Sequence, residues 1–204
     1  EEPIVSEKSE NATLGLQKSV SPFILRRLKK DVLSELPDKI ETVLVSPMEN
    51  EQRKLYDANV SLAKQELGDK STGMAQERIK ILAILTRLRQ ICCDPGLIYE
   101  NFTGKSGKLE QCMDLIGTCL ASGHKILLFS QFTTMLDRIA DRLQANGFSY
   151  YTLTGSTKTQ ERIRLVNAFN EDNTNVFLIS LKAGGTGLNL TGADIVIHYD
   201  PWWN

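Results

Sequence analysis

The second half of the sequence predicts an α/β fold with a parallel sheet, and two observations carry that prediction. Four short apolar segments of strand length occur there, namely "KILLFSQ" (125–131), "YYTL" (150–153), "NVFLIS" (175–180) and "DIVIHY" (194–199). Segments with helical periodicity alternate with them. Strands that alternate with helices form right-handed crossovers, so the strands come out parallel. Continuous apolar runs such as "KILLF" are typical of strands that helices cover on both faces.

Length and composition fit one globular domain, or one domain with an appended arm. The chain has 204 residues, of which 41% are apolar and 24% are charged. No apolar run is long enough to span a membrane, and the polar, acidic start lacks the pattern of a secretory signal. That start is expected to be a frayed lead-in or the cut edge of a longer chain. The net charge of −1 provides no global basic field that would indicate nucleic acid.

Cysteine and histidine usage argues against a metal site. The four cysteines form no C-x-x-C pair, and the chain has only two histidines. Without a secretory signal, such cysteines indicate a reducing intracellular compartment. That compartment would be the cytoplasm or nucleoid of a bacterium, or the nucleus of a eukaryote.

The first half is expected to contain an arm, a strand and two helices. Residues 17–30 hold five basic residues and no acid, which indicates either a solvated face or a binding patch. The alternation in "IETVLVSPM" (40–48) predicts a strand. Helices are predicted over 49–67 and 74–91, the second with an apolar stripe of Ile81, Ile84, Leu85, Leu88 and Ile91. The sequence "DPG" ends this second helix.

Three helices are predicted in the second half. The first, over 107–122, has an apolar face and ends at Gly123. Capping boxes are predicted at the start of the next two, from Thr134 with Asp137 and from Thr157 with Gln160. These two helices place their apolar residues on one side, with Leu136, Ile139, Ala140 and Leu143 in one and Ile163, Val166 and Phe169 in the other.

Polar or glycine-rich residues follow three of the predicted strands. They are Ser130, Gln131 and Thr133, then Thr154, Gly155, Ser156 and Thr157, then Lys182, Gly184, Gly185, Thr186 and Gly187. Ligands of open α/β sheets gather at the carboxyl ends of strands, where hydroxyls, backbone N–H groups and helix N-termini suit phosphate oxygens. The same residue types also cap helices and form turns, so both interpretations stay open. Their recurrence at three strands favours a phosphate-binding shelf.

Other nucleotide and catalytic motifs are not matched. "GGTGLN" is no dinucleotide fingerprint, because Leu190 stands where glycine or alanine is needed. "FTGKSGK" ends like a phosphate-binding loop, but Tyr99 replaces the first glycine of that pattern. No G-x-S-x-G or H-E-x-x-H pattern occurs. His124 is therefore expected to be a surface turn residue, and His198 a core or edge residue.

Several stretches together resemble the Swi/Snf-type, double-stranded-DNA-translocating ATPases of helicase superfamily two. Residues 22–41 are similar to the segment that joins the two RecA-like lobes of that family. "EQRKLYDA" and "LRQICCDPGLI" resemble the helices that follow that segment. "KILLFSQF" resembles motif IV, "LTGST" with "ERIRLVNAFN" the motif after it, and "LISLKAGGTGLNLTGADIVIHYDPWWN" motif V with its extension. The resemblance covers residues 18–204.

The resemblance implies the C-terminal RecA-like lobe, a three-layer α/β fold of the P-loop NTPase type with a parallel sheet. It divides the chain into a flexible lead-in (1–17), an interlobe linker or brace (18–41) and the lobe (42–204), with a helical insertion at about 50–98. The first lobe, and the last helicase motif with its arginines, would lie outside the chain. The chain departs from the family at Asp94, where a histidine is usual, so the packing of that turn stays open.

The resemblance also implies roles for single residues. The DNA-facing edge would consist of Ser130, Gln131, Gly155, Ser156, Thr157, Lys182, Ala183, Gly184, Gly185 and Thr186. On the ATP side of the cleft would lie Gly187, Leu188 and Asn189, where the missing side chain of Gly187 would let the backbone approach a ligand. Interlobe contact and coupling would come from Arg26, Arg27, Lys29, Lys30, Asp200, Trp202, Trp203 and Asn204. Plain packing is an equal expectation for the two tryptophans.

The expected function is that of a longer ATP hydrolase that translocates along double-stranded DNA. ATP with Mg²⁺ would be its cofactor, with the metal ligands on the first lobe, so this chain alone is expected to hold no catalytic residue and to be inactive. Its expected partners are double-stranded DNA, the first lobe and DNA-bound protein complexes, but no membrane. Two alternatives stay open: a passive nucleic-acid-binding module, and a metabolic enzyme that uses a nucleotide cofactor.

Overall fold

The computed structural model describes residues 10–24, 39–68, 74–185 and 187–201. It divides into two compact units, Glu1–Leu44 and Val45–Asn204. In the first unit, helix α2 (Glu10–Val20) buries none of its residues. The basic residues predicted for the interlobe brace lie outside the described residues: Arg26, Arg27, Lys29 and Lys30. Every helix of the described ranges is too short or too polar to cross a lipid bilayer.

The second unit is built on a four-stranded parallel sheet, as predicted. Its strands are β1 (Ile126–Ser130), β2 (Tyr150–Leu153), β3 (Val176–Ser180) and β4 (Ile195–His198), in the order β2-β3-β1-β4. The two central strands, β1 and β3, are buried almost throughout. Helices cover both of their faces, which is why these two segments are continuous apolar runs.

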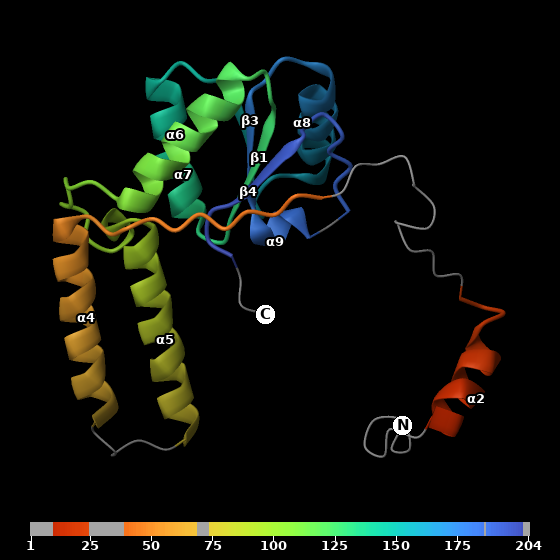
Figure 1. Ribbon diagram of the computed structural model, residues 1–204, viewed down its shortest axis with the longest axis horizontal. Coiled ribbons are helices and arrows are strands. Elements are labelled where there is room, and N and C mark those ends of the chain that lie inside the picture. The colour runs from red at the N-terminus through yellow and green to blue at the C-terminus, as the bar shows by residue number, and fades with distance from the viewer. Residues whose placement is uncertain (1–9, 25–38, 69–73, 186, 202–204) are drawn as a thin grey trace. The chain divides into compact units, whose positions relative to one another are not determined.

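Helices form a layer on each face of the sheet (Figure 1). On one face lie α6 (Gly107–Ala121) and α7 (Thr133–Ala145), and on the other α8 (Thr159–Glu171) and the short α9 (Leu181–Gly184). The strand alternation divides the core between the two faces. Ile126 and Leu128 pack against α6 and α7, whereas Leu127 packs against α8. This three-layer arrangement confirms the predicted fold class.

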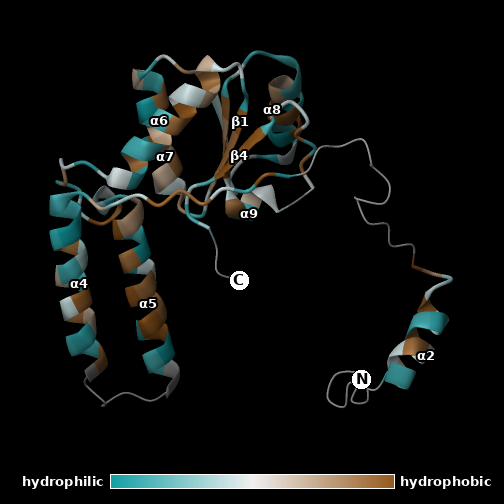
Figure 2. Cartoon of the chain, viewed as in Figure 1, coloured by the Kyte–Doolittle hydropathy of each residue, from teal (hydrophilic) through white to brown (hydrophobic). Residues whose placement is uncertain are grey.

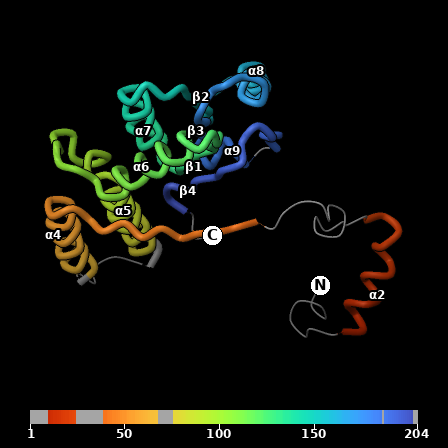
Figure 3. The backbone as a smooth tube through the Cα atoms, turned by 45° about the horizontal axis from the view of Figure 1, so that its top comes forward, coloured from red at the N-terminus to blue at the C-terminus, as the bar shows by residue number. Residues whose placement is uncertain are grey.

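A helical hairpin projects from the lobe away from the sheet (Figures 1 and 3). It consists of α4 (Asn50–Gly68) and α5 (Met74–Cys93), and a 3₁₀ turn (Pro95–Leu97) leads from it towards α6. Gln52 ties the base together, because its Nε2 donates to the Ile91 carbonyl at 2.8 Å while its Oε1 accepts from the Gly107 N–H at 3.3 Å. Gln52 and Ile91 are both fully buried there.

The predicted apolar stripe of α5 is only partly buried. Ile84 and Ile91 lie in the core, but Ile81 and Leu85 are 38% and 41% exposed. Figure 2 shows the apolar colouring continuing along the outer part of α5. Among the described residues of the second unit, α4 lies beside α5 outside the lobe, and one neighbouring helix cannot cover the whole stripe.

Two local predictions are wrong. Residues 39–48 form no strand in the described structure, and Ile40, Val43 and Val45 are more than 80% exposed. A strand-forming pattern needs a neighbouring backbone with which to pair, and the pattern itself does not provide one. The helix starts also differ, because Phe132 and Lys158 occupy the N-cap positions of α7 and α8 without side-chain caps. Thr157 Oγ1 instead accepts from the Thr154 N–H at 3.0 Å, inside the preceding turn.

Candidate nucleic-acid interface

The loops singled out in the sequence lie together at one edge of the sheet. Because the strands are parallel and in register, with Ser130 opposite Ser180 and Phe129 opposite His198, their carboxyl ends meet there. We call this edge the carboxyl edge. It carries residues 131–132 after β1, 154–158 after β2, 181–185 and 187 after β3, and 199–201 after β4.

The candidate DNA-contact residues differ in exposure along the carboxyl edge. Gly155, Ser156, Lys182 and Gly185 are exposed, and Gln131, Thr157 and Gly184 are half-buried. Thr154 and Ser156 pair through their hydroxyls at 2.8 Å, a contact confined to their own loop. Thr186 lies outside the described residues. Four of the ten predicted contact residues are therefore fully open to a ligand that lies along the edge, and three more are partly open.

Ser130 and Ala183 are exceptions, because both side chains are buried. The Ser130 side chain is fully buried, and its Oγ accepts from the Phe132 N–H at 3.1 Å. Ser130 thus faces protein in this structure and shapes the start of the loop after β1. Ala183 is 2% exposed, and its carbonyl accepts from Arg162 Nη1 at 2.9 Å.

The three glycines of the loop after β3 serve different structural needs. A Cβ on Gly184 would lie 2.7 Å from Phe129 Cε1, so glycine lets α9 pack closely on the sheet. Gly187 has φ of +58°, a left-handed conformation that other residues rarely adopt. A Cβ on Gly185 would meet nothing closer than the Leu181 carbonyl oxygen at 3.9 Å. The backbone conformation gives Gly187 a reason to be glycine that is independent of any ligand.

Helix α8 holds both sides of that loop. Arg162 binds the Ala183 carbonyl, as above, and Asn170 Nδ2 donates to the Asn189 carbonyl at 2.9 Å. Asn170 Oδ1 also accepts from the Gly192 N–H at 2.9 Å. Leu188 packs partly buried against the core beneath α8, while Asn189 is exposed. Neither Arg162 nor Asn170 was predicted as a site residue, although both belong to the stretch "ERIRLVNAFN".

The segment after β4 is anchored by buried polar contacts. Tyr199 donates its hydroxyl to the Cys93 carbonyl at 2.8 Å, and Lys108 Nζ donates to the Tyr199 carbonyl at 3.2 Å. The Asp200 carboxylate accepts from the Gln131 N–H at 3.1 Å. Burial raises the pKa of Asp200 above its ordinary value, and hydrogen bonds from Ser130 and Gln131 oppose that rise. Trp202, Trp203 and Asn204 lie outside the described residues.

Arg89 of α5 reaches the same place. Its Nη1 donates to Gln131 Oε1 at 3.1 Å, and its Nη2 donates to the Pro201 carbonyl at 3.1 Å. The guanidinium also lies 5.9 Å from the centre of the Phe132 ring. Arg89 was not predicted as a site residue, although it belongs to the stretch "LRQICCDPGLI" and lies off the apolar stripe of α5.

Asp94 fits the turn at which the sequence departs from the family pattern. Its side chain is buried, and Oδ1 accepts from the Gly96 N–H at 2.7 Å. Arg138 Nη1 lies 3.5 Å from the same oxygen, and Arg138 Nη2 donates to the Gly96 carbonyl at 2.9 Å. The carboxylate therefore closes the turn, and the Arg138 guanidinium balances its charge.

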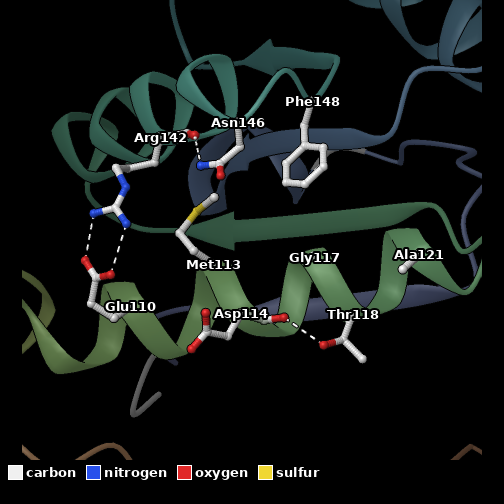
Figure 4. A pocket seen from close by; sticks show the side chains of 9 residues that line it. All are labelled: Glu110, Met113, Asp114, Gly117, Thr118, Ala121, Arg142, Asn146 and Phe148. Atoms are coloured by element: carbon white, nitrogen blue, oxygen red, sulfur yellow. Dashed lines mark hydrogen bonds and ion pairs between the residues drawn. The ribbon is translucent and has the colours of Figure 1, made fainter.

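Two surface hollows lie elsewhere. One, of about 540 Å³, is the groove between α6 and α7 in Figure 4, where Arg142 and Glu110 form a two-bonded ion pair of 2.7 and 3.0 Å. The other, of about 560 Å³, lies beside Asp94 and residues 102–106. Neither is lined by a predicted site residue. Among the described residues, no cluster of cysteine, histidine and carboxylate side chains has the make-up of a metal site.

Family models match almost the whole sequence. An SNF2-related domain matches residues 1–97, and a helicase conserved C-terminal domain matches residues 107–204. A putative ATP-dependent helicase/translocase, YwqA of Bacillus subtilis, is 39% identical over 99% of this chain, and nuclear protein STH1/NPS1 of Saccharomyces cerevisiae is 36% identical over 93%. The chain spans only 23% and 15% of the lengths of these relatives.

Solved structures agree with the family models. The C-terminal domain of a Sulfolobus solfataricus SWI2/SNF2 ATPase has a TM-score of 0.74 and 33% identity, over 82% of this chain and 74% of that one. The core of a Sulfolobus solfataricus SWI2/SNF2 ATPase in complex with double-stranded DNA also has a TM-score of 0.74, with 32% identity over 97% of this chain and 43% of that one. The chain therefore belongs to the Swi/Snf-type ATPases of helicase superfamily two and has the fold of their C-terminal RecA-like lobe.

Proposed function

We propose that this chain is the second RecA-like lobe of an ATP-dependent translocase on double-stranded DNA. The observation that carries the proposal is the carboxyl edge, where loops from successive parallel strands present amides, hydroxyls and one lysine side by side. Such groups bind phosphate oxygens whatever the base sequence. The similar ATPase core of Sulfolobus solfataricus in complex with double-stranded DNA supports this assignment.

Binding to DNA would depend on short-range contacts rather than on long-range electrostatic attraction. The net charge of −1 gives no field that gathers DNA, and of the proposed contact residues only Lys182 carries a positive charge. Gln131, Ser156 and Thr157 would add neutral donors to phosphates of one strand. We therefore expect weak binding by this chain alone, decreasing as salt is added.

ATP with Mg²⁺ would bind between this lobe and a first lobe that holds the metal ligands, and its γ-phosphoryl group would be transferred to water with ADP as the leaving group. The loop at Gly187–Asn189 fits a position beside the nucleotide. Gly187 and Asn189 are exposed, and a Cβ built on Gly187 would meet no atom within 4 Å, so a ligand has space to approach the Gly187 Cα from that side. The loop is braced from behind by Asn170 of α8. When the two lobes close, a movement of this loop would therefore be transmitted to the adjoining DNA-contact residues.

An ATPase comparison tests the proposal. The longer protein that carries this chain and the 204-residue chain alone would each be assayed with and without duplex DNA. We expect DNA-stimulated hydrolysis by the longer protein and none by the chain alone, because phosphoryl transfer needs groups from both lobes. Turnover by the chain alone would refute the assignment. Duplex binding without hydrolysis by the longer protein would instead favour a passive binding module.

A further inference from the structure

Arg89 joins three elements that are distant in sequence. It stands near the end of α5, and its two Nη atoms reach Gln131 Oε1 after β1 and the Pro201 carbonyl after β4, each at 3.1 Å. The contact pairs are separated by 42 and 112 residues along the chain. Arg89 thus ties the helical hairpin to the carboxyl edge at two points, in addition to the bond from Tyr199 to the Cys93 carbonyl.

We propose that Arg89 is a positioning residue that orients the Gln131 side chain for contact with DNA. The inference rests on the proposed function and adds a residue that the family resemblance did not assign. Gln131 is held at two points, since Asp200 accepts from its backbone N–H and Arg89 donates to its side-chain oxygen.

The chemistry of the two side chains fixes the direction of the Gln131 amide. A guanidinium can only donate hydrogen bonds, so the amide oxygen must face Arg89. The amide NH₂ group then points away from Arg89, with its two hydrogens available to an acceptor. Phosphate oxygens are acceptors only, so this orientation is the one that a DNA-contacting glutamine requires.

The fork of Arg89 suits this task better than a lysine would. One planar group makes both contacts at once, whereas a lysine ammonium is a point charge on a flexible stem. The nearby Phe132 ring, 5.9 Å from the guanidinium carbon, further limits its orientation. Holding Gln131 and the Pro201 carbonyl together therefore depends on arginine.

Removal of Arg89 should leave the fold in place. The junction has other buried bonds, from Tyr199 to the Cys93 carbonyl and from Ser106 Oγ to the same carbonyl at 2.7 Å. The Gln131 N–H would still be bound by Asp200. The contacts of Arg89 with Gln131, Pro201 and the Phe132 ring would be among those lost.

The test measures DNA-stimulated ATP hydrolysis by the longer protein as duplex DNA is titrated. Arg89→Ala should raise the DNA concentration for half-maximal stimulation about fivefold to tenfold, with the KM for ATP little changed. Arg89→Lys should remain impaired, with more than half of the increase in the logarithm of that DNA concentration still present. Arg87→Ala is the matched control, because Arg87 lies exposed on the same helix two residues earlier and should have no effect.

A double-mutant cycle separates positioning from general damage. If Arg89 acts through Gln131, the Arg89→Ala, Gln131→Ala double variant should be no worse than the more affected single variant. Additive losses, an unchanged DNA response in Arg89→Ala, or an equal loss in Arg87→Ala would each overturn the role of Arg89. A parent protein without any DNA stimulation would overturn the proposed function itself, which is a distinguishable result.

Discussion

The carboxyl edge has two halves that use similar residues differently. In the half formed by β1 and β4, Ser130 and Asp200 are buried and bonded inside the protein. In the half formed by β2 and β3, Ser156, Lys182 and Gly185 are exposed. A polar residue after a strand can therefore either build the edge or face a ligand, and its burial decides which. Apart from Gln131, the first half is a frame that is bonded inside the protein, whereas the second half is an open contact surface.

The two halves should differ most in the unfolding free energy that is lost when a polar side chain is removed, as Asp200→Ala tests. This change leaves the Gln131 N–H without its buried acceptor, so the free energy of unfolding should fall by about 2–3 kcal/mol. Ser156→Ala, in the exposed half, should change it by less than about 0.5 kcal/mol. Denaturant unfolding of the 204-residue chain would measure both. Equal costs at the two positions would break the distinction between frame and contact surface.

Gly184 and Gly185 offer a sharper comparison because they are neighbours. Gly184→Val would push a side chain into Phe129 and Ile179, and overpacking of this kind should cost about 2 kcal/mol. Gly185→Val meets open space and should leave the melting temperature close to that of the parent. In the longer protein, Gly185→Val should nonetheless abolish most DNA stimulation of ATP hydrolysis. A large loss of stability with DNA stimulation retained would show that Gly185 serves only the turn.

Gly187→Ala should have a smaller effect on folding. Its φ of +58° is a conformation in which a Cβ costs about 1 kcal/mol, with no steric clash added by neighbours. Thermal unfolding would measure the change, with Gly155→Ala as a control since that residue is exposed, has space around it and is not among the glycines with positive φ. If both changes cost nothing, the left-handed conformation would not be what requires glycine at Gly187.

A smaller effect is expected in the pH dependence of the free energy of unfolding, through the buried Asp200. Burial raises the folded-state pKa of Asp200 above its ordinary value of 3.8, so the folded protein binds this proton more tightly than the unfolded chain. The contribution of Asp200 to stability should therefore fall as pH rises from 3.8 through the folded-state pKa. Asp200→Asn keeps an acceptor for the Gln131 N–H and should remove this dependence. Unfolding free energies of both proteins across the acidic range would check it, and parallel curves would contradict it.

The sequence predicted the main elements because their signals are local. The apolar runs gave all four strands to within about two residues, and helical periodicity placed α4 to α8. The strand predicted at 40–48 failed because pairing depends on a second backbone, which no short pattern specifies. The cap predicted at Thr157 failed for a related reason, since the Thr157 hydroxyl accepts a hydrogen bond from Thr154 inside its own turn.

Two pairs of like residues show what a sequence pattern leaves undecided. Ser130 ends β1 and Ser156 lies three residues beyond the end of β2, yet the first is buried in the protein and the second is open to solvent. Arg87 and Arg89 both lie off the apolar stripe of α5, but two residues along a helix turn a side chain through about 200°, so only one is directed towards the carboxyl edge.

The sequence by itself determined the strands, the helices and the family of this protein, because periodicity and motif spacing are properties of short segments. Only the tertiary structure decided which polar groups hydrogen-bond inside the protein and which remain accessible to a ligand. Gln131 and Asp200 come together only when β1 and β4 lie side by side, and Arg89 meets the Pro201 carbonyl only when the end of α5 lies near the end of β4. Hydrogen bonds require atoms within about 3 Å of each other, and only the folded chain sets that distance.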